Sequence, residues 1–413
     1  MAEEGPLAGI RVLDLTTMLV GPYATQIMSD LGADVIKVES PSGDPMRYVG
    51  PMRHQGMGGI YLGANKGKRS IVVDLKNTDG QYLLLEMAKK CTVLVHNMRT
   101  EAASRLHIDY ASVSRCNPSI IYCDITGYGA GGPYSDRPAY DDTIQGVSGM
   151  AYLESHIAGE PRYSPSDVAD KVGGLYAAIG MLTALFERER TGRGRKIVVP
   201  MFESMVSFVL MEHLYGATFR PALSKPEYER TVSNVRKPYR TLDGFISMAV
   251  YTDQHWSKFF DLIGRAELKT DSRFVDLSAR SRHYDELYAV VEESLRTKTT
   301  HEWLEIFTVA DIPSMPVNST EQLLTDPHLQ AIRLFDEVRH PTEGPILAVR
   351  SPLAMSFYPN ATSGVAHRLG ENTREVLIEF GYSLAEINNF VSRGAVKEFV
   401  TGDRESGREE ITT

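Results

Sequence analysis

The sequence has few of the features that mark secreted and membrane proteins. Its 413 residues include only three cysteines, Cys91, Cys116 and Cys123, whose spacing fits neither a metal site nor a disulfide framework. No apolar run approaches the length of a membrane span, and the acidic N-terminus does not resemble a signal peptide. These absences predict a cytoplasmic protein without a membrane partner.

The chain also lacks an excess of positive charge. Its formal net charge of -9 argues against nucleic acid as the main partner, so basic clusters are expected to bind a small anion instead. With 42% hydrophobic and 23% charged residues, the composition is typical of a soluble globular protein. A chain of 413 residues is too long for one simple core, which predicts two domains.

Apolar segments in the first half of the chain alternate between strand and helix patterns. Strands are expected at residues 10–15, 34–39, 71–74, 92–95, 119–123 and 197–199, and the helices between them at residues 22–31, 79–90 and 100–106. This alternation predicts an α/β fold with a parallel sheet. The turn at residues 16–22 lacks the glycine triplet of nicotinamide and flavin sites, which argues against a dinucleotide-dependent dehydrogenase.

The middle of the chain has a different character. Residues 216–240 are polar and contain three prolines, so we expect a linker there. Residues 241–312 are predicted to form a small α+β domain, followed by a return linker at residues 313–345. The large domain would then consist of residues 1–215 and 346–413.

A loop at residues 164–170 precedes Gly173, Gly174 and a long apolar helix, for which we expect one buried stripe. An aspartate just before a helix is most often an N-cap. Two aspartates lie here, so Asp167 could be the cap and Asp170 could lie beside the glycines, where a bulky ligand can approach the backbone. A carboxylate stripped of water in such a setting can attack an acyl carbon.

Two further segments have the composition of ligand-binding loops. Lys66, Lys68 and Arg69 surround a glycine just before a strand, which suits a phosphate-rich ligand but is also typical of a solvated basic turn. Residues 125–133 are rich in glycine and follow the carboxyl end of a predicted strand. Ligands bind at that end of parallel sheets, and the backbone amides of these glycines could stabilise an oxyanion.

Short motifs spread over residues 6–397 carry a family resemblance. They are LAGIRVLD at residues 7–14, GP at 21–22, LGADVIKVE at 31–39, KRS at 68–70, TGYG at 126–129, TGRG at 191–194, DGF at 243–245 and LGENT at 369–373. In order and spacing, they resemble the family III CoA-transferases, which include formyl-CoA:oxalate and carnitine CoA-transferases.

The resemblance implies an architecture and a set of ligands. It implies a large Rossmann-like domain with a parallel sheet, built from both ends of the chain, and a smaller α+β middle domain. Two chains would form an interlocked homodimer, which is unusual because protein chains rarely thread through one another. The ligands would be an acyl-CoA and a free carboxylic acid, with coenzyme A as substrate and no metal.

The resemblance also assigns roles to residues by their positions in these motifs. Asp170 takes the position of the catalytic aspartate, and Tyr140 and Asp141 lie beside the acyl group. The positions implied to contact CoA are Val20, Lys68, Arg69, Asn97, Met98, Arg99 and Arg105. Ser40 stands where some members carry an arginine that contacts the nucleotide, so that contact is in doubt.

The reaction implied is the transfer of CoA from an acyl-CoA donor to a free acid, through an aspartyl anhydride and an aspartyl-CoA thioester. Within the family, the sequence most resembles members that use succinyl-CoA with dicarboxylic acids. Arg236, Lys237 and Arg240 could pair with a second carboxylate or could be solvated linker charges.

Two alternatives to CoA transfer are a non-catalytic acyl-CoA-binding protein and a 2-methylacyl-CoA racemase of the same fold. The intact Asp170 loop argues against a non-catalytic acyl-CoA-binding protein. A racemase would carry a histidine base at the position of Tyr140, and tyrosine, with a pKa of about 10, is a poor base at neutral pH.

Overall fold

The computed structural model describes residues 5–356, 358 and 364–399, and the chain divides into two compact units. Unit 1 comprises Met1–Ser148, Ser164–Phe208 and Ile332–Thr413, and unit 2 comprises Gly149–Tyr163 and Val209–Ala331. Both segments predicted to be linkers, residues 216–240 and 313–345, form elements of their own, including strands that pair within a unit.

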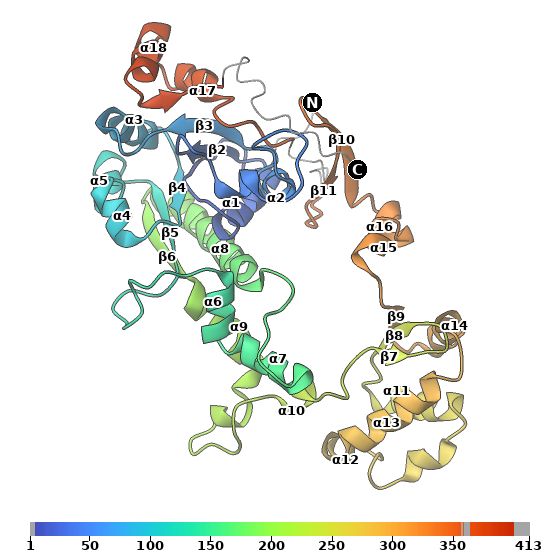
Figure 1. The fold of residues 1–413 in the computed structure, drawn as a ribbon. Helices are drawn as coiled ribbons and strands as arrows, with labels where there is room; N and C mark the ends of the chain where they lie inside the picture. The colour runs from blue at the N-terminus through green and yellow to red at the C-terminus, as the bar shows by residue number, and fades with distance from the viewer. Residues whose placement is uncertain (1–4, 357, 359–363, 400–413) are drawn as a thin grey trace. The chain divides into compact units, whose positions relative to one another are not determined.

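A seven-stranded sheet forms the centre of unit 1 (Figure 1). Its order is β12-β3-β2-β1-β4-β5-β6, and the strands are β1 (Arg11–Asp14), β2 (Asp34–Glu39), β3 (Arg69–Val73), β4 (Val93–His96), β5 (Ile121–Thr126), β6 (Arg195–Pro200) and β12 (Val396–Lys397). Strands β1 to β6 pair in parallel, and β12 pairs antiparallel with β3. The prediction of a parallel sheet is thus confirmed, and the order β3-β2-β1-β4-β5-β6 is that of doubly wound nucleotide-binding folds.

Helices flank this sheet. They include α1 (Val20–Asp30), α3 (Thr78–Ala88), α4 (Thr100–Arg105), α5 (Tyr110–Cys116), α6 (Asp141–Val147), α8 (Val168–Thr191), α9 (Met201–His213), α17 (Thr373–Glu379) and α18 (Leu384–Ser392). Apolar residues of α3, α5, α17 and α18 pack on the strands in one buried cluster. Between β2 and β3, the chain forms the 3-10 helix η1 (Pro45–Tyr48) and α2 (Gly59–Ala64). The hairpin of β10 (Phe335–His340) and β11 (Gly344–Val349) also belongs to unit 1.

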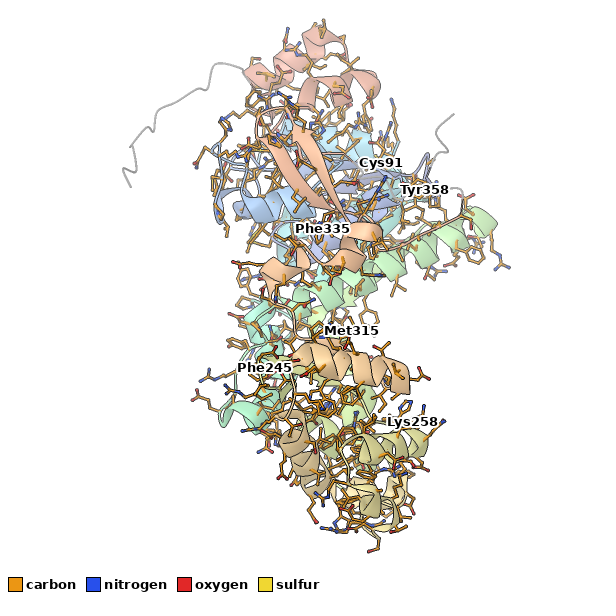
Figure 2. All side chains as sticks on the ribbon, turned by 90° about the vertical axis from the view of Figure 1, so that its right-hand side faces the viewer. Cys91, Phe245, Lys258, Met315, Phe335 and Tyr358 are labelled. Atoms are coloured by element: carbon orange, nitrogen blue, oxygen red, sulfur yellow. The ribbon has the colours of Figure 1, made fainter. Side chains whose placement is uncertain are left out.

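Unit 2 is an α+β body with its own core. Its antiparallel sheet joins β7 (Tyr239–Arg240), β8 (Phe245–Met248) and β9 (Ser314–Pro316). Phe245 and Met315, labelled in Figure 2, come from the neighbouring strands β8 and β9. The other elements are α7 (Met150–Ala158), η2 (Tyr215–Thr218), α10 (Glu229–Val232), α11 (Asp253–Leu262), η3 (Ala266–Thr270), α12 (Leu277–Arg282), α13 (Tyr284–Leu295), α14 (Thr300–Ala310), α15 (Thr320–Leu323) and α16 (Pro327–Ala331). The side chains of α11, α13 and α14 form a largely aromatic core.

The long helix α8 packs closely against α1 in unit 1. A Cβ atom added to Gly174 would lie 2.7 Å from the backbone oxygen of Val20, and one added to Gly173 would lie 3.1 Å from the Val20 side chain. The two glycines therefore serve contact between helices, and the expectation that they admit a ligand is wrong.

The buried face of α8 also differs from the predicted stripe. The buried side consists mostly of small residues, including Ala169, Ala177, Ala178 and Ala184. Leu175, Ile179 and Phe186, which recur at helical spacing and so fit the expected stripe, are exposed on unit 1. Close packing against α1 selects small side chains, so the larger apolar residues lie on the opposite side.

By length and composition, α8 is apolar enough to cross a membrane, but half of its apolar window is buried inside the protein. A buried core helix passes the same test, so this helix is weak evidence for a membrane span.

The close contact of α8 with α1 predicts the effect of a methyl group. We expect Gly174→Ala to destabilise the protein by about 1–3 kcal/mol, because overpacking forces the backbone apart. Gly146→Ala on α6 is the matched control, since a Cβ atom there meets nothing within 4 Å. Urea unfolding of the two variants measures the difference, and equal midpoints would contradict the role assigned to Gly174.

Candidate active site

Asp170 lies in the first turn of α8, and not in the preceding loop as the sequence suggested. Asp167 occupies the N-cap position, but its side chain accepts no capping hydrogen bond. Instead, the backbone N–H of Asp170 donates to Oδ1 of Asp141 on α6, over 2.9 Å. A carboxylate from a neighbouring helix thus satisfies one of the free amides at the start of α8. The Asp170 side chain is left available for chemistry.

The surroundings of Asp170 disfavour its charge. Burial, together with the charges of the nearby Asp141 and Asp167, raises the pKa of its carboxyl from 3.8 to about 7, against a lowering effect of Lys171. Desolvation and like charges both penalise the ionised form. At neutral pH, Asp170 is therefore divided between its acid and its carboxylate, as suits a group used in catalysis.

Gln145 holds the residues around Asp170 in place. Its side-chain amide donates to Oδ2 of Asp141 and to the backbone oxygen of Ser166, while its oxygen accepts from the N–H of Ser164 over 2.9 Å. Gln145 and Asp141 lie four residues apart on α6, so their side chains meet on one face. This buried amide fixes both the loop before α8 and the carboxylate that contacts its first turn.

Asp170 faces a cavity of about 250 Å³ in unit 1. The wall comes from the segments that follow β1, β4 and β5, together with Met201 at the start of α9. The residues of these segments are Thr17, Met18, Val20, Asn97, Met98, Arg99, Thr100, Glu101, Ile125, Thr126, Gly127, Ser135, Asp136, Arg137, Pro138, Ala139 and Tyr140. Strands β1 and β4 are neighbours where the strand order reverses, which is where ligands bind in open parallel sheets.

Most of the residues assigned from the family motifs meet at this cavity. Val20, Asn97, Met98, Arg99 and Tyr140 line it with Asp170. Asn97 makes two hydrogen bonds to the backbone of Thr17, so the ends of β1 and β4 are joined. Tyr140 is 63% exposed at the N-cap of α6, whereas Asp141 is buried and does not line the cavity.

Lys68 and Arg69 do not line the cavity. Lys68 is 1% exposed, and its ammonium group donates to Asp14, Thr25, Asn65 and the backbone oxygen of Pro22. Arg69 forms ion pairs with Asp34, Glu375 and Glu379. The geometry therefore does not support a direct CoA contact for these two residues, because both cations are already paired within the protein.

The two remaining positions also lie away from the cavity wall. Arg105 is exposed in the last turn of α4, beyond the residues of that helix that line the cavity. Ser40 is exposed, and its hydroxyl lies 2.9 Å from that of Ser42.

The buried Asp14–Lys68 pair holds the turn between β1 and α1. Asp14 accepts from the backbone and hydroxyl of Thr16, and burial lowers the pKa of Lys68 to about 8. Burial alone would raise the pKa of Asp14, but the charges of Lys68 and Lys37 and the bonded hydroxyls lower it to about 2. Both groups are ionised at neutral pH, so the pair stabilises the turn that contributes Thr17 and Met18 to the cavity wall.

Other parts of the wall were not foreseen from sequence. Met18 lies in the turn after β1 with a φ of 68°, and its N–H donates to Oδ1 of Asp44 over 3.2 Å. A non-glycine residue rarely adopts this left-handed conformation, and only its contacts in the fold explain it here. In the glycine-rich segment, the N–H of Gly129 is taken by Oε1 of Glu203, whereas Gly127 lines the cavity.

Comparisons with known proteins bear on this geometry. The sequence model of CoA-transferase family III matches residues 7–373. A succinate–glutarate CoA-transferase from Agrobacterium fabrum is 32% identical, over 91% of this chain and 96% of its own length. The succinyl-CoA:glutarate CoA-transferase of Homo sapiens is 30% identical, over 96% and 91%. The crystal structure of Rv3272 from Mycobacterium tuberculosis superposes with a TM-score of 0.78 and 30% identity, over 90% of this chain and 99% of that one.

The buried ion pair predicts a loss of stability when one partner is removed. We expect Lys68→Met to cost about 3–5 kcal/mol, because it leaves the Asp14 carboxylate buried without its cation. The control Lys76→Met removes an exposed lysine and should change stability by less than about 0.5 kcal/mol. A double variant with Asp14→Leu should recover part of the loss in urea unfolding. A loss no larger than that of the control would show that the pair does not anchor the turn.

The pKa of Asp170 predicts how a reaction depends on pH. The rate of any step that needs the ionised carboxylate should rise with pH through a midpoint near 7 in the free enzyme. Asp141→Asn removes one like charge, so this midpoint should fall. Asp142→Asn, at the exposed neighbouring position, should leave it unchanged. The profile of kcat/KM against pH measures both, and identical profiles for the two variants would exclude coupling between Asp141 and Asp170.

Proposed function

The chain belongs to CoA-transferase family III and is a CoA-transferase, and on that premise we propose that it moves CoA from succinyl-CoA to a free dicarboxylic acid through covalent intermediates on Asp170. The observation that carries the proposal is the position of Asp170. Its carboxyl faces a cavity at the carboxyl ends of the parallel strands, and burial raises its pKa to about 7.

The first half of the reaction loads CoA onto the protein. The Asp170 carboxylate attacks the thioester carbon of the donor, the C–S bond breaks, and CoA leaves as a thiolate. The product is an anhydride between Asp170 and the donor acid. The thiolate then attacks the aspartyl carbon of this anhydride, releases the donor carboxylate and forms an aspartyl-CoA thioester. Covalent catalysis divides one difficult exchange into steps of similar free energy.

The second half reverses these steps with a new acid. The acceptor carboxylate attacks the aspartyl thioester, which gives a second anhydride and a free thiolate. Attack of the thiolate on the acceptor carbon yields the new CoA ester and regenerates the Asp170 carboxylate. Each step exchanges one acyl bond for another, so no net proton, electron or water is consumed.

The residues around Asp170 support these steps. The start of α8 places backbone dipoles near developing negative charge, and the N–H of Asp170 itself is held by Asp141. Val20, Asn97, Met98, Arg99 and Tyr140 are the wall residues that we assign to binding the acyl-CoA. Arg99 supplies a cation there, which suits the phosphates of CoA.

The substrate class is taken from the relatives. The Agrobacterium and human proteins are named for succinate or succinyl-CoA and glutarate, and their similarity extends over nearly all of this chain. Succinyl-CoA as donor and a dicarboxylate of similar length as acceptor are therefore the first pair to test.

We further propose a homodimer in the cytoplasm. On unit 1, α8 exposes Leu175, Ile179 and Phe186 along one side, with a spacing that places them on a common face. A contiguous apolar face of this kind is typical of a surface covered by a partner. A second copy of the chain is the partner that the family resemblance implies.

The proposed reaction is tested by incubating the full chain with succinyl-CoA and glutarate and separating the CoA thioesters. Oxalate, malate, itaconate, acetate and carnitine serve as alternative acceptors. We expect glutaryl-CoA from the wild type and none from Asp170→Ala, while Asp167→Ala retains exchange. Adding hydroxylamine with succinyl-CoA should leave a hydroxamate on Asp170, detectable by mass spectrometry of its peptide. Exchange by Asp170→Ala would exclude this nucleophile, and exchange with monocarboxylates alone would exclude the dicarboxylate assignment.

A further inference from the structure

A second cavity, of about 390 Å³, lies entirely within unit 2. It is formed by one residue of α10, by β7 and the segment that leads into it, by β8 and β9 with the residues beside them, and by one residue of α13. Its lining residues are Arg230, Arg236, Lys237, Pro238, Tyr239, Ser247, Met248, Ala249, Tyr288, Pro313, Ser314 and Met315. This volume is in the range of sites for small organic ligands.

Three cations converge on this cavity. Arg236 is exposed, and among the described residues no acceptor is found for its guanidinium group. Arg230 lies 5.5 Å from the ring of Tyr251 and beside Tyr288. Lys237 pairs with Glu292 over 3.2 Å, and Glu292 also pairs with Arg296. The cations outnumber this carboxylate, so Arg236 is left for an external anion.

Arg240 is not part of this group. It was expected beside Arg236 and Lys237, but it does not line the cavity. Tyr239 and Arg240 are consecutive residues of β7, and consecutive side chains of a strand point to opposite faces. Tyr239 is buried and lines the cavity, so Arg240 points away from it.

The remaining wall is apolar and aromatic. Tyr239 and Tyr288 stack with their ring centroids 6.1 Å apart and their planes at 19°. Met248 and Met315, the latter labelled in Figure 2, contribute flexible apolar surface from β8 and β9. A wall of this kind suits the carbon chain of an organic acid, whereas inorganic phosphate has no apolar part to bury.

We propose that this cavity binds a small dicarboxylate, with one carboxylate held by the guanidinium group of Arg236 and the carbon chain against Tyr239, Tyr288 and Met315. A planar guanidinium group donates two parallel hydrogen bonds to a carboxylate, and the neighbouring Lys237 also lines the cavity. The proposal of a binding site at this cavity depends only on residues of unit 2. The choice of a dicarboxylate rests on the proposed function, because such an acid is the acceptor assigned there.

The test is titration calorimetry of the full chain with glutarate in the absence of any CoA compound. We expect Arg236→Ala to weaken binding about tenfold or more, since a charge-assisted bond to a carboxylate is lost. Arg236→Lys keeps the charge but loses the bidentate geometry, so its affinity for glutarate should lie between that of the wild type and that of Arg236→Ala. Arg240→Ala is the matched control, because it removes an exposed arginine of the same segment that does not line the cavity. Its binding should equal that of the wild type.

Three outcomes would overturn the proposal. The first is equal binding of glutarate by Arg236→Ala and Arg240→Ala. The second is loss of binding in Asp170→Asn, which would place glutarate at the nucleophile. The third is displacement of glutarate by an equal concentration of inorganic phosphate. The failure of this inference is distinct from that of the proposed function. Glutaryl-CoA formation is measured with succinyl-CoA present, whereas calorimetry is performed without a donor.

Discussion

The buried ion pair between Asp14 and Lys68 is the constraint on which the cavity depends. Asp14 ends β1, and the ammonium group of Lys68 reaches it from the start of β3 while also binding Thr25 and the Pro22 oxygen of α1. One cation therefore ties two strands and a helix together under the turn at Thr16–Met18. Lys37 adds a second buried bridge, because it donates to the backbone oxygen of Thr16 and pairs with Asp44.

The position of Asp170 follows from the same turn. Val20, which begins α1, packs on Gly173 and Gly174 of α8, so these contacts limit how closely the two helices approach. Asp141 then fixes the amide of Asp170, and Gln145 fixes Asp141. A nucleophile needs positioning to within fractions of an ångström, and the carboxylate that we propose for this role lies on a helix and not on a loop.

Much of the α/β sheet was predictable because its signals are local. Strand β2 matches its predicted range, and α1, α3 and α4 match theirs within two residues, since apolar periodicity marks these elements directly. The partner of Lys68 was not predictable, because a basic turn has the same composition whether its cations bind a ligand or pair with a buried carboxylate. Likewise, no local signal distinguishes a glycine that admits a ligand from one that admits a helix. Gln145 was overlooked for the same reason: its role depends on Ser164 and Asp141, which the fold brings to it.

The pKa of Asp170 has a further consequence for the proposed reaction. Raising it from 3.8 to about 7 corresponds to about 4 kcal/mol of destabilisation of the ionised carboxylate relative to its acid. The anhydride and the thioester on Asp170 are both uncharged, so forming either one removes a negative charge from a buried position beside Asp141. The repulsion that makes the free carboxylate unfavourable is therefore relieved in the covalent intermediates. The same environment that leaves part of Asp170 protonated at neutral pH thus favours the bonds on which CoA transfer depends.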